Sequence, residues 1–338
     1  MIAVVILNWN GVDMMRRFLP SVLNHSPEAS VYVGDNGSTD GSVEMLRNEF
    51  PTVGIVRLDR NYGFAEGYNK TLAEIKADIY VLLNSDVEVT PGWLAPIVSF
   101  LRERPDVAAC QPKMLALNNP GSFEYAGACG GFIDRYGYPF CRGRIFSTVE
   151  TDEGQYDEPA EVLWASGACL VIRADDYWRA GGLDGRFFAH NEEIDLCWRL
   201  WLEGRKIYCL PQSHIYHLGG GTLPQGNPKK TFLNFRNNLT MLYKNLPDNE
   251  LRRVMRVRRL LDYVAALQSV AANRNLDDFK AIIRARKAFN KWKADFAADR
   301  ERIQRNRQPL PDNVRKPFSV LRQYYCKQNK YFSRLPER

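Results

Sequence analysis

The chain has 338 residues with 45% hydrophobic and 25% charged side chains and a formal net charge of +7, enough for one large domain with a smaller appendage and too apolar for extensive disorder. No apolar run approaches the roughly 18 residues that span a bilayer, so we expect a protein that is neither secreted nor transmembrane and that lies in the cytoplasm. The seven cysteines are scattered without paired metal-site spacing, as is usual for reduced thiols, and they disfavour a zinc site.

The first 90 residues alternate between strand-like and helix-like segments. Apolar stretches predict strands at 2–7, 30–33, 53–58 and 79–83, and helical periodicity predicts helices at 13–24, 40–49 and 64–75. This alternation is typical of an α/β domain with a mostly parallel sheet and helices on both faces. Because ligands of open sheets bind beyond the carboxyl ends of the strands, the polar segments at 8–10, 35–36 and 84–86 predict a shared site at one edge.

Two of these polar segments carry a carboxylate. Asp35 stands at the last strand position, before an Asn-Gly turn, where it is well placed to accept hydrogen bonds from a base or ribose. Asp86 ends the short tip that follows strand 79–83, and such a tip can hold a divalent cation over a diphosphate. The segment has neither a Gly-rich dinucleotide fingerprint nor a phosphate-loop lysine motif, which disfavours a dinucleotide or an NTPase.

A second acidic group, Glu192, Glu193 and Asp195, opens a predicted helix that ends near Gly204. Acids in a first helical turn have an ordinary role, because they complement the positive end of the helix dipole. Three carboxyl groups packed beside two phenylalanines would also raise one another's pKa toward the range of a general base. The pattern leaves both roles open.

Taken together, these motifs resemble a family 2 glycosyltransferase of the rhamnosyltransferase-like branch. The resemblance covers residues 1 to about 245, and the order and spacing of the motifs make it specific. The matching segments, quoted from this chain, are Val4-Val5-Ile6-Leu7-Asn8-Trp9-Asn10-Gly11, Asp35-Asn36-Gly37-Ser38-Thr39-Asp40, Asn61-Tyr62-Gly63-Phe64-Ala65-Glu66-Gly67-Tyr68-Asn69, Leu82-Leu83-Asn84-Ser85-Asp86, Gly167-Ala168-Cys169-Leu170, Phe187-Phe188, Glu192-Glu193-Ile194-Asp195-Leu196-Cys197 and His217-Leu218-Gly219-Gly220-Gly221.

The resemblance implies the GT-A fold, with a donor half at about 1–115 and an acceptor half at about 116–245. It also implies an NDP-sugar donor, a divalent cation (Mn²⁺ or Mg²⁺) and inversion at the anomeric carbon. By position, Asp35 would contact the base, Asp86 and His217 would bind the metal, and Glu193 would be the catalytic base, with Glu192 or Asp195 binding the acceptor or anchoring the helix. The residues expected to bind the nucleotide sugar are Asn8, Asn10, Asp35, Asn61, Asn69, Asn84 and Ser85.

The chain departs from the family pattern at two places. The metal motif begins with Asn84 instead of Asp, so this tip offers one anionic ligand, Asp86. The helix carries Glu192-Glu193 where relatives carry Glu-Asp, which moves the carboxylate of the base by about one methylene. For His217 two roles remain open, a metal ligand or a histidine hydrogen-bonded beside a Gly-rich turn, and an imidazole ligand would favour Mn²⁺ over Mg²⁺.

The charge of the chain is unevenly divided. Residues 1–249 contain 23 Lys and Arg against 30 Asp and Glu, whereas residues 250–338 contain 23 against 9. A turn at Leu246-Pro247-Asp248 precedes a helical pattern, so we expect a basic α-helical extension over residues 246–338, after a domain over residues 1–245. On the first helix of the extension, apolar residues share one face and arginines surround it. This surface suits an anionic membrane or the packing of the helix on its own domain or on a second subunit.

We therefore expect a metal-assisted inverting glycosyltransferase that uses a UDP- or dTDP-sugar and acts in cell-surface polysaccharide or glycolipid assembly. Its acceptor would be a saccharide or a lipid-linked saccharide, and the protein would lie in the cytoplasm, with the inner face of the membrane as a second location. The alternatives are a sugar-phosphate nucleotidyltransferase and a non-catalytic binding module of the same fold. The sequence predicts no nucleic-acid partner, since no recognised module accompanies the basic charge, and it leaves a homo-oligomer open.

Overall fold

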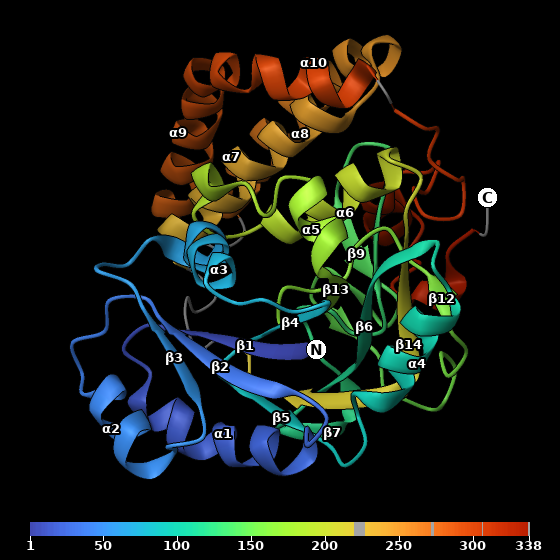
Figure 1. Ribbon diagram of the computed structural model, residues 1–338. Helices are drawn as coiled ribbons and strands as arrows, with labels where there is room; N and C mark the ends of the chain where they lie inside the picture. The colour runs from blue at the N-terminus through green and yellow to red at the C-terminus, as the bar shows by residue number, and fades with distance from the viewer. Residues whose placement is uncertain (220–226, 272–273, 306, 337–338) are drawn as a thin grey trace.

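The computed structural model describes residues 1–219, 227–271, 274–305 and 307–336. In these residues a ten-stranded sheet runs through the molecule in the order β12-β14-β6-β13-β4-β1-β2-β3, with β5 beside β14 and β7 beside β6 (Figure 1). The strands are β1 (Ile2–Asn8), β2 (Ser30–Asp35), β3 (Gly54–Arg57), β4 (Ile79–Leu83), β5 (Val87–Val89), β6 (Val107–Ala116), β7 (Asn119–Phe123), β12 (Ala160–Glu161), β13 (Cys169–Arg173) and β14 (Lys206–His217).

Helices cover both faces of this sheet, which is why β1 and β4 are apolar along almost their whole length. One face is covered by α1 (Val12–His25), α2 (Ser42–Glu49) and α4 (Ala95–Glu103), whose apolar side chains share a core with β1, β2 and β4. The other face is covered by α3 (Gly63–Ala73), α5 (Ala174–Arg179) and α6 (Glu192–Leu202) (Figure 1). The fold class expected from the sequence, a central sheet flanked by helices, is confirmed.

The predicted strands and helices of the first 90 residues all form, with ends that differ by one or two residues. Strands β4, β1, β2 and β3 are parallel, as expected. Strand β13 then lies between β4 and β6 and is antiparallel to both, so the whole sheet is mixed. This strand begins at the edge where the polar tips lie, because its first residue, Cys169, pairs with Leu83 at the carboxyl end of β4.

A second, four-stranded sheet forms between residues 120 and 160. It consists, within the described residues, of β8 (Gly131–Ile133), β9 (Pro139–Cys141), β10 (Arg144–Ile145) and β11 (Thr148–Val149). The helices that follow β14 are α7 (Pro228–Asn245), α8 (Asp248–Ala271), α9 (Leu276–Trp292) and α10 (Ala297–Arg305). They form a layer over α5 and α6 (Figure 1). The predicted turn at Leu246-Pro247 separates α7 from α8.

The end of the chain differs from the expected helical extension. After α10 the described residues 307–336 contain only short turns of helix and wrap over the small sheet. The backbone N–H of Lys316 donates to the carbonyl of Ile133, the N–H of Val320 donates to Asp134, and the ring of Phe332 packs on Phe132. The basic extension is therefore helical only up to about Arg305, and its last part belongs to the packing of the acceptor half.

Candidate active site

The carboxyl ends of β1 and β2 form the first part of the site. Asn8 and Asp35 lie side by side in the register of these strands, and both are buried. Asp35 Oδ2 accepts the N–H of Ser38 at 3.2 Å, and Asn8 Nδ2 donates to the hydroxyl of Ser38 at 3.3 Å. Oδ1 of Asn8 and Oδ1 of Asp35 have no partner in the described part of the chain. Buried acceptors without donors are costly, so they mark a place for a ligand that offers N–H or O–H groups.

The loops that follow β1 and β2 are tied together beside these two residues. The N–H of Asn10 donates to the hydroxyl of Ser38 at 3.0 Å, and Asn10 Oδ1 accepts the N–H of Thr39 at 2.8 Å. Asp40 accepts the N–H of Val12 at 3.0 Å and so links the start of α1 to the second loop. Asn10 therefore shapes the loop with its side-chain oxygen.

Asn61 holds the start of α3 against the second strand end. Its Oδ1 accepts the N–H of Gly63 at 2.8 Å and Nδ2 of Asn36 at 3.2 Å. Gly63 has a positive φ of 78°, and a Cβ there would lie 2.5 Å from the ring of Phe188. This close approach explains the glycine in the Asn61-Tyr62-Gly63-Phe64 motif, because any side chain would push the segment around Phe188 away.

The structure gives Asn69 a different role from the expected contact with a nucleotide sugar. Its Nδ2 donates to the carbonyl of Leu183 at 2.7 Å, and its Oδ1 accepts the hydroxyl of Tyr177 at 2.6 Å and the N–H of Leu183 at 3.1 Å. The amide of Asn69 thus ties α3 to the segment before α6. Its Oδ1 already accepts two hydrogen bonds and has no lone pair left for a ligand. The expectation was wrong for Asn69 because the motif continues past the sheet edge into the buried face of the helix.

The tip after β4 and the end of β14 place Asp86 beside His217. Strand β5 follows Asp86 and pairs with β14 so that Val87 lies opposite His217, which brings His217 Nε2 to 3.0 Å from Asp86 Oδ1. Both side chains are buried. Burial alone would raise the pKa of Asp86, but the hydrogen bond and charge of His217 lower it below the ordinary value. Gly220 and Gly221, which complete this motif in the sequence, lie outside the described residues.

A third residue, Glu124, completes this group and was not expected from the sequence. It directly follows β7, is 5% exposed, and places Oε1 3.3 Å from His217 Nδ1. Burial disfavours the charged ring of His217, but the two carboxylates outweigh it and raise its pKa to about 10. Glu124 carries no local sequence signal, since only the pairing of β7 with β6 brings it here.

Asp86 and His217 fit a divalent cation that a substrate diphosphate also binds. Two neighbouring ligands of an octahedral ion with bonds of about 2.1 Å lie about 3.0 Å apart, which matches the separation of Asp86 Oδ1 and His217 Nε2. A carboxylate against the other ring nitrogen is the usual support of a metal-bound histidine, and Glu124 is placed for it. Among the described residues no cluster of three or more His, Cys, Asp and Glu is arranged as a complete metal site, so further ligands must come from substrate and water.

The same tip lies against the segment that faces Glu193. The N–H of Asn84 donates to the carbonyl of Ala168 at 3.0 Å. The preceding residue, Gly167, lies against α6, because a Cβ there would be 3.8 Å from the carboxyl carbon of Glu193. Asn84 and Ser85 are half-buried at the edge of this arrangement. The short segment Gly167-Ala168 therefore lies between two groups, with Asn84 bonded to Ala168 and the carboxyl of Glu193 beside Gly167.

The carboxyl groups of Glu192 and Glu193 are held in a way that suits proton transfer. Burial raises the pKa of Glu193 to about 7. Burial and the charge of Glu193 raise the pKa of Glu192 well above its ordinary value. Oε2 of each has no partner within the described ranges. Two neighbouring carboxyls with raised pKa values are typical of groups that exchange protons near neutral pH.

The segment before α6 has a strained backbone. The φ values of Phe188, His190 and Asn191 are 68°, 72° and 69°. Residues other than glycine rarely adopt this left-handed backbone conformation. Asn237 on α7 restrains it, because its Nδ2 lies within hydrogen-bonding distance of the carbonyls of Phe187, Ala189 and His190 at 3.0, 2.8 and 2.8 Å. Asn191 directly precedes α6, but its side chain forms no cap on the helix and instead accepts Nδ2 of Asn238 at 3.3 Å. Strain held by surrounding contacts is common at functional sites.

We expect Asn237→Ala to lower the turnover number of the enzymatic reaction about tenfold while donor binding changes little. Without the amide, the segment before α6 relaxes and Glu193 loses its position and part of its burial. The pKa on the acid limb of the pH–rate profile should then fall from about 7 toward the ordinary value for Glu. Thr240→Val is the control, because the Thr240 hydroxyl bonds only within α7. An unchanged profile for Asn237→Ala would contradict this role.

Asp195 lies away from these groups and anchors α6 to α7. It is fully buried and accepts Nε of Arg199 at 2.9 Å, Nζ of Lys244 at 2.7 Å and Nδ2 of Asn245 at 2.8 Å. Of the two roles expected for Asp195, the structure supports that of helix anchor, since both carboxylate oxygens are engaged.

We predict that Asp195→Ala destabilises the fold by about 3–5 kcal/mol, because it leaves Arg199 buried with an uncompensated charge, while Lys244 keeps only its ion pair with Asp184. Chemical denaturation followed by circular dichroism measures this directly. Glu192→Gln serves as the comparison, since it removes an acid of the same helix turn that has no ion-pair partner in the described structure. A variant that keeps its stability but loses catalysis would return Asp195 to the catalytic group.

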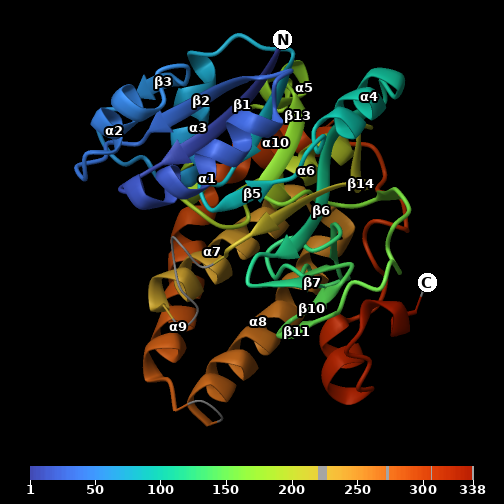
Figure 2. The same ribbon diagram turned by 90° about the horizontal axis from the view of Figure 1, so that it is seen from below.

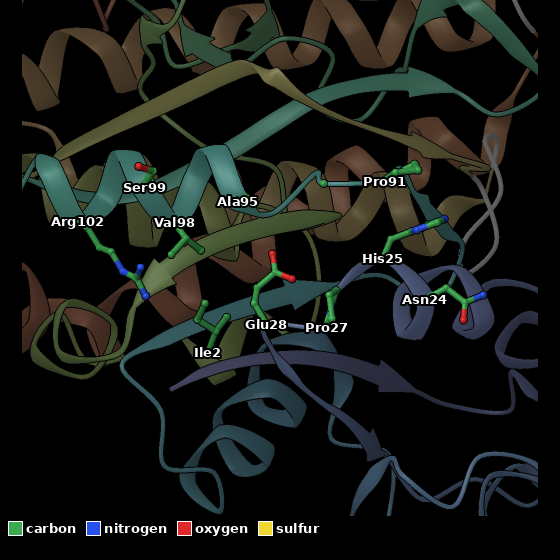
Figure 3. Close-up of a pocket in the computed structure, with 11 residues that line it drawn as sticks. Ile2, Asn24, His25, Pro27, Glu28, Pro91, Ala95, Val98, Ser99 and Arg102 are labelled. Carbon is green, nitrogen blue, oxygen red and sulfur yellow. The ribbon is translucent and has the colours of Figure 1, made fainter.

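A pocket of about 570 Å³ lies elsewhere, at the amino ends of β1 and β2. Figure 3 shows that its walls come from the end of α1 and from α4, with Ile2, Glu28 and Arg102 among the lining residues. It contains none of the strand-end residues described above. The candidate site and this pocket are therefore different places in the molecule.

The chain is similar to known glycosyltransferases. The sequence model of the family described as "Glycosyl transferase family 2" matches residues 3–136. The chain is 27% identical over 233 residues to "N-acetylglucosaminyl-diphospho-decaprenol L-rhamnosyltransferase" of Mycobacterium tuberculosis, covering 63% of this chain and 75% of that protein. It is 22% identical to "Rhamnosyltransferase WbbL" of Escherichia coli, covering 64% of this chain and 83% of the relative.

Solved structures show the same fold. The structure titled "Crystal structure of GalNAc-T7 with UDP, GalNAc and Mn2+" matches with a TM-score of 0.58 and 18% identity, covering 88% of this chain and 56% of the other. A mannosyltransferase from Pyrobaculum calidifontis, solved "in complex with GDP-Man and Mn2+", matches with a TM-score of 0.53 and 13% identity, covering 90% of this chain and 86% of the other. At these identities the likeness concerns the fold, and the expected GT-A fold is confirmed.

Proposed function

We propose that this chain is a member of glycosyl transferase family 2 that transfers a sugar from an NDP-sugar to a hydroxyl group with inversion, because residues 3–136 match that family and the chain is similar to two rhamnosyltransferases. One observation carries the proposal. The Glu193 carboxyl, with a pKa raised to about 7, lies across Gly167-Ala168 from the tip that holds Asp86 beside His217. Single-displacement sugar transfer requires a base for the acceptor hydroxyl, and a cation that binds the diphosphate assists the departure of the NDP.

The nucleotide would bind at the ends of β1 and β2. Asn8 Oδ1 and Asp35 Oδ1 are buried acceptors that lack donors, and a pyrimidine base offers an N–H group for such a position. Relatives of this fold are solved with UDP or GDP-Man, and we propose a UDP- or dTDP-sugar for this chain. Asn84 and Ser85, which lie between the base position and Glu193, would face the sugar and its diphosphate.

Asp86 and His217 would hold a divalent cation, with Glu124 orienting the imidazole. Such a cation supplies Lewis-acid stabilisation of the charge that grows on the departing diphosphate. The imidazole favours Mn²⁺ over Mg²⁺, since Mg²⁺ binds oxygen almost exclusively.

Glu193 would act on the acceptor. In its ionised form it takes the proton of the acceptor hydroxyl as that oxygen bonds to the anomeric carbon and the bond to the NDP oxygen breaks on the opposite side. The proton resides on Glu193 after transfer and passes to solvent when products leave. Burial and the charge of Glu193 raise the pKa of Glu192 well above its ordinary value, which favours the protonated form, and in that form Glu192 would donate a hydrogen bond to the acceptor.

We propose a lipid-linked saccharide as acceptor and cell-surface polysaccharide or glycolipid as product. The relative from Mycobacterium tuberculosis carries a diphospho-decaprenol acceptor in its name, and another, from Myxococcus xanthus, is named an O-antigen biosynthesis protein. None of the helices in the described residues is long and apolar enough to span a bilayer. As a separate part of the proposal, the enzyme would reach such an acceptor from the inner surface of the membrane.

The test is to incubate the purified protein with Mn²⁺ and a panel of UDP-, dTDP- and GDP-sugars, and to record donor binding and NDP release. We expect micromolar to millimolar binding of at least one donor, strengthened by the metal. Absence of binding at millimolar levels, with and without metal, would overturn the donor assignment. The two alternatives give different products, since a nucleotidyltransferase would release pyrophosphate from NTP and sugar phosphate, and a non-catalytic module would bind donor without releasing NDP.

A further inference from the structure

The outward face of α8 is unusually apolar toward its C-terminal end. Leu260, Tyr263, Val264 and Leu267 are 65%, 40%, 51% and 63% exposed. Their spacing of three and four residues places them in one stripe. The opposite face of the helix is buried by Val254, Arg258, Asp262, Ala266 and Ser269. The apolar stripe, which consists of Leu260, Tyr263, Val264 and Leu267, therefore faces solvent on the side of α8 opposite to its packed side.

Arginines occupy the same outward side toward the start of the helix. Arg252, Arg253, Arg256 and Arg259 are all exposed, and none of them forms an ion pair in the part of the chain that the structure describes. Between Leu251 and Ala271 the only acid is Asp262, which is fully buried and paired with Arg258 and Arg286. The outward face of α8 thus combines unpaired positive charge with exposed apolar surface and carries no carboxylate.

The position of α8 leaves this face free. Helices α8 and α9 pack together as a pair, and Figure 2 shows their joined ends projecting beyond the sheet. At the start of α9 Leu276 is 57% exposed and continues the apolar surface. The first turn of α9 is tied to the first turn of α7, because the Thr231 hydroxyl donates to Asp278 Oδ1 at 2.7 Å. On the next turn of α7, Asn234 Oδ1 lies 3.5 Å from Nδ2 of Asn191, which directly precedes Glu192. The projecting end is therefore close to the acceptor side of the candidate site.

We propose that the outward face of α8 binds the surface of an anionic lipid bilayer, with the apolar stripe entering the boundary between headgroups and acyl chains and the arginines contacting lipid phosphates. A helix with basic residues beside an apolar stripe is suited to lie in that boundary. Each arginine near an anionic surface adds to the attraction, and the apolar side chains leave water.

A second copy of this chain fits the same face less well. A two-fold dimer through α8 would place the same surface on both sides and bury the exposed arginines of both copies in one interface, where residues 251–271 offer no exposed carboxylate and Asp248 and Glu250 are already paired with Arg300 and Arg315. A bilayer with anionic headgroups offers the complementary charge and an apolar interior at once. Charge complementarity therefore selects the membrane.

This inference rests on the proposed lipid-linked acceptor for its purpose, since a bilayer beside the projecting end of α8 would bring such an acceptor to Glu193. It does not depend on the donor, the metal or the base. Binding to lipid can consequently be measured without substrates, and a failure of either proposal is recognised separately.

The experiment measures co-sedimentation of the full chain with vesicles of phosphatidylcholine alone and with 30% phosphatidylglycerol added. We expect binding to the anionic vesicles, weakened by 0.5 M salt, and little binding to the neutral ones. Arg253→Gln/Arg256→Gln should lower the partition coefficient about 25-fold, at about fivefold for each arginine. Leu260→Gln/Leu267→Gln should lower it at least tenfold. These four residues are exposed, so the variants should fold and keep turnover with a soluble acceptor.

The control is Arg47→Gln/Lys76→Gln, which removes the same charge from exposed positions of the donor half and should leave binding within about twofold. Equal loss in this control would mean that net charge, and not α8, drives binding, and would overturn the proposal. So would equal binding of wild type and both α8 variants, or no binding of wild type to anionic vesicles. Analytical ultracentrifugation adds one more outcome, because a dimer that Leu260→Gln/Leu267→Gln dissociates, without lipid binding, would assign the face to a second copy.

Discussion

Glu193→Gln is expected to abolish sugar transfer while donor binding is kept. The amide has the size of the carboxylate but cannot accept the acceptor proton, so kcat should fall about 10²- to 10⁴-fold, the usual contribution of a general base. The Kd for the NDP-sugar should change less than about threefold, because Asp35 and Asp86 belong to other elements. Isothermal titration with donor and Mn²⁺, together with a product assay, measures both quantities.

The pH dependence follows from the raised pKa of Glu193. The base works when ionised, so kcat/KM of the wild type should rise with pH up to about 7 and then level off. Stability should follow the opposite direction. Because the folded-state pKa lies above the unfolded one, ionisation destabilises the fold, and this cost grows between about pH 4.5 and 7. Glu193→Gln should therefore be more stable than wild type at pH 8, by about 1–3 kcal/mol.

Glu192→Gln is the matched control, since Glu192 precedes Glu193 on the same turn and is also buried. If Glu192 stays protonated and only donates a hydrogen bond, its amide variant should keep most of the turnover and the acid limb near pH 7. Full loss of turnover in Glu192→Gln, with activity retained in Glu193→Gln, would exchange the two roles. If both amide variants kept their turnover, Asp195 would be the remaining carboxylate to test.

The parts of the site that follow strands could be predicted from the sequence, because strand ends are marked locally. Asp35 and Asp86 stand where apolar runs stop, and the parallel order of β4, β1 and β2 brings those ends to one edge. The same sequence pattern misplaced Asn69, since a motif shows which residues are near one another in the chain but not toward which face of a helix each one points.

The residues that support the site could not be predicted, because they arrive by long-range packing. Glu124 reaches His217 only through the pairing of β7 with β6, and Asn237 reaches the segment before α6 from a helix about 45 residues further along the chain. Both are ordinary polar residues in their own surroundings. The return of residues 307–336 onto the small sheet is of the same kind, since its contacts involve a partner segment almost 200 residues away.

Asp86→Asn is expected to remove the metal dependence of donor binding. With Asn84 at the first position of the tip, Asp86 is the one anionic side chain that the tip supplies, and Glu124 lies against the far nitrogen of His217. An amide oxygen is a much weaker ligand than a carboxylate, so the affinity for Mn²⁺ in the presence of UDP should fall about 100-fold or more. Titration of Mn²⁺ followed by electron paramagnetic resonance measures this affinity without catalysis.

The remaining metal-free affinity for the nucleotide separates this effect from damage to the fold. Asn8 and Asp35 hold the base end of the site on β1 and β2, whereas Asp86 follows β4, so UDP binding without metal should be the same in Asp86→Asn and wild type. Glu88→Gln is the control, because it removes the same charge two residues after Asp86. Glu88 is the second residue of β5, and its side chain is exposed. If Asp86→Asn kept wild-type affinity for Mn²⁺, the cation would have to bind elsewhere, and the contact of Asp86 with His217 would serve only to join the start of β5 to the end of β14.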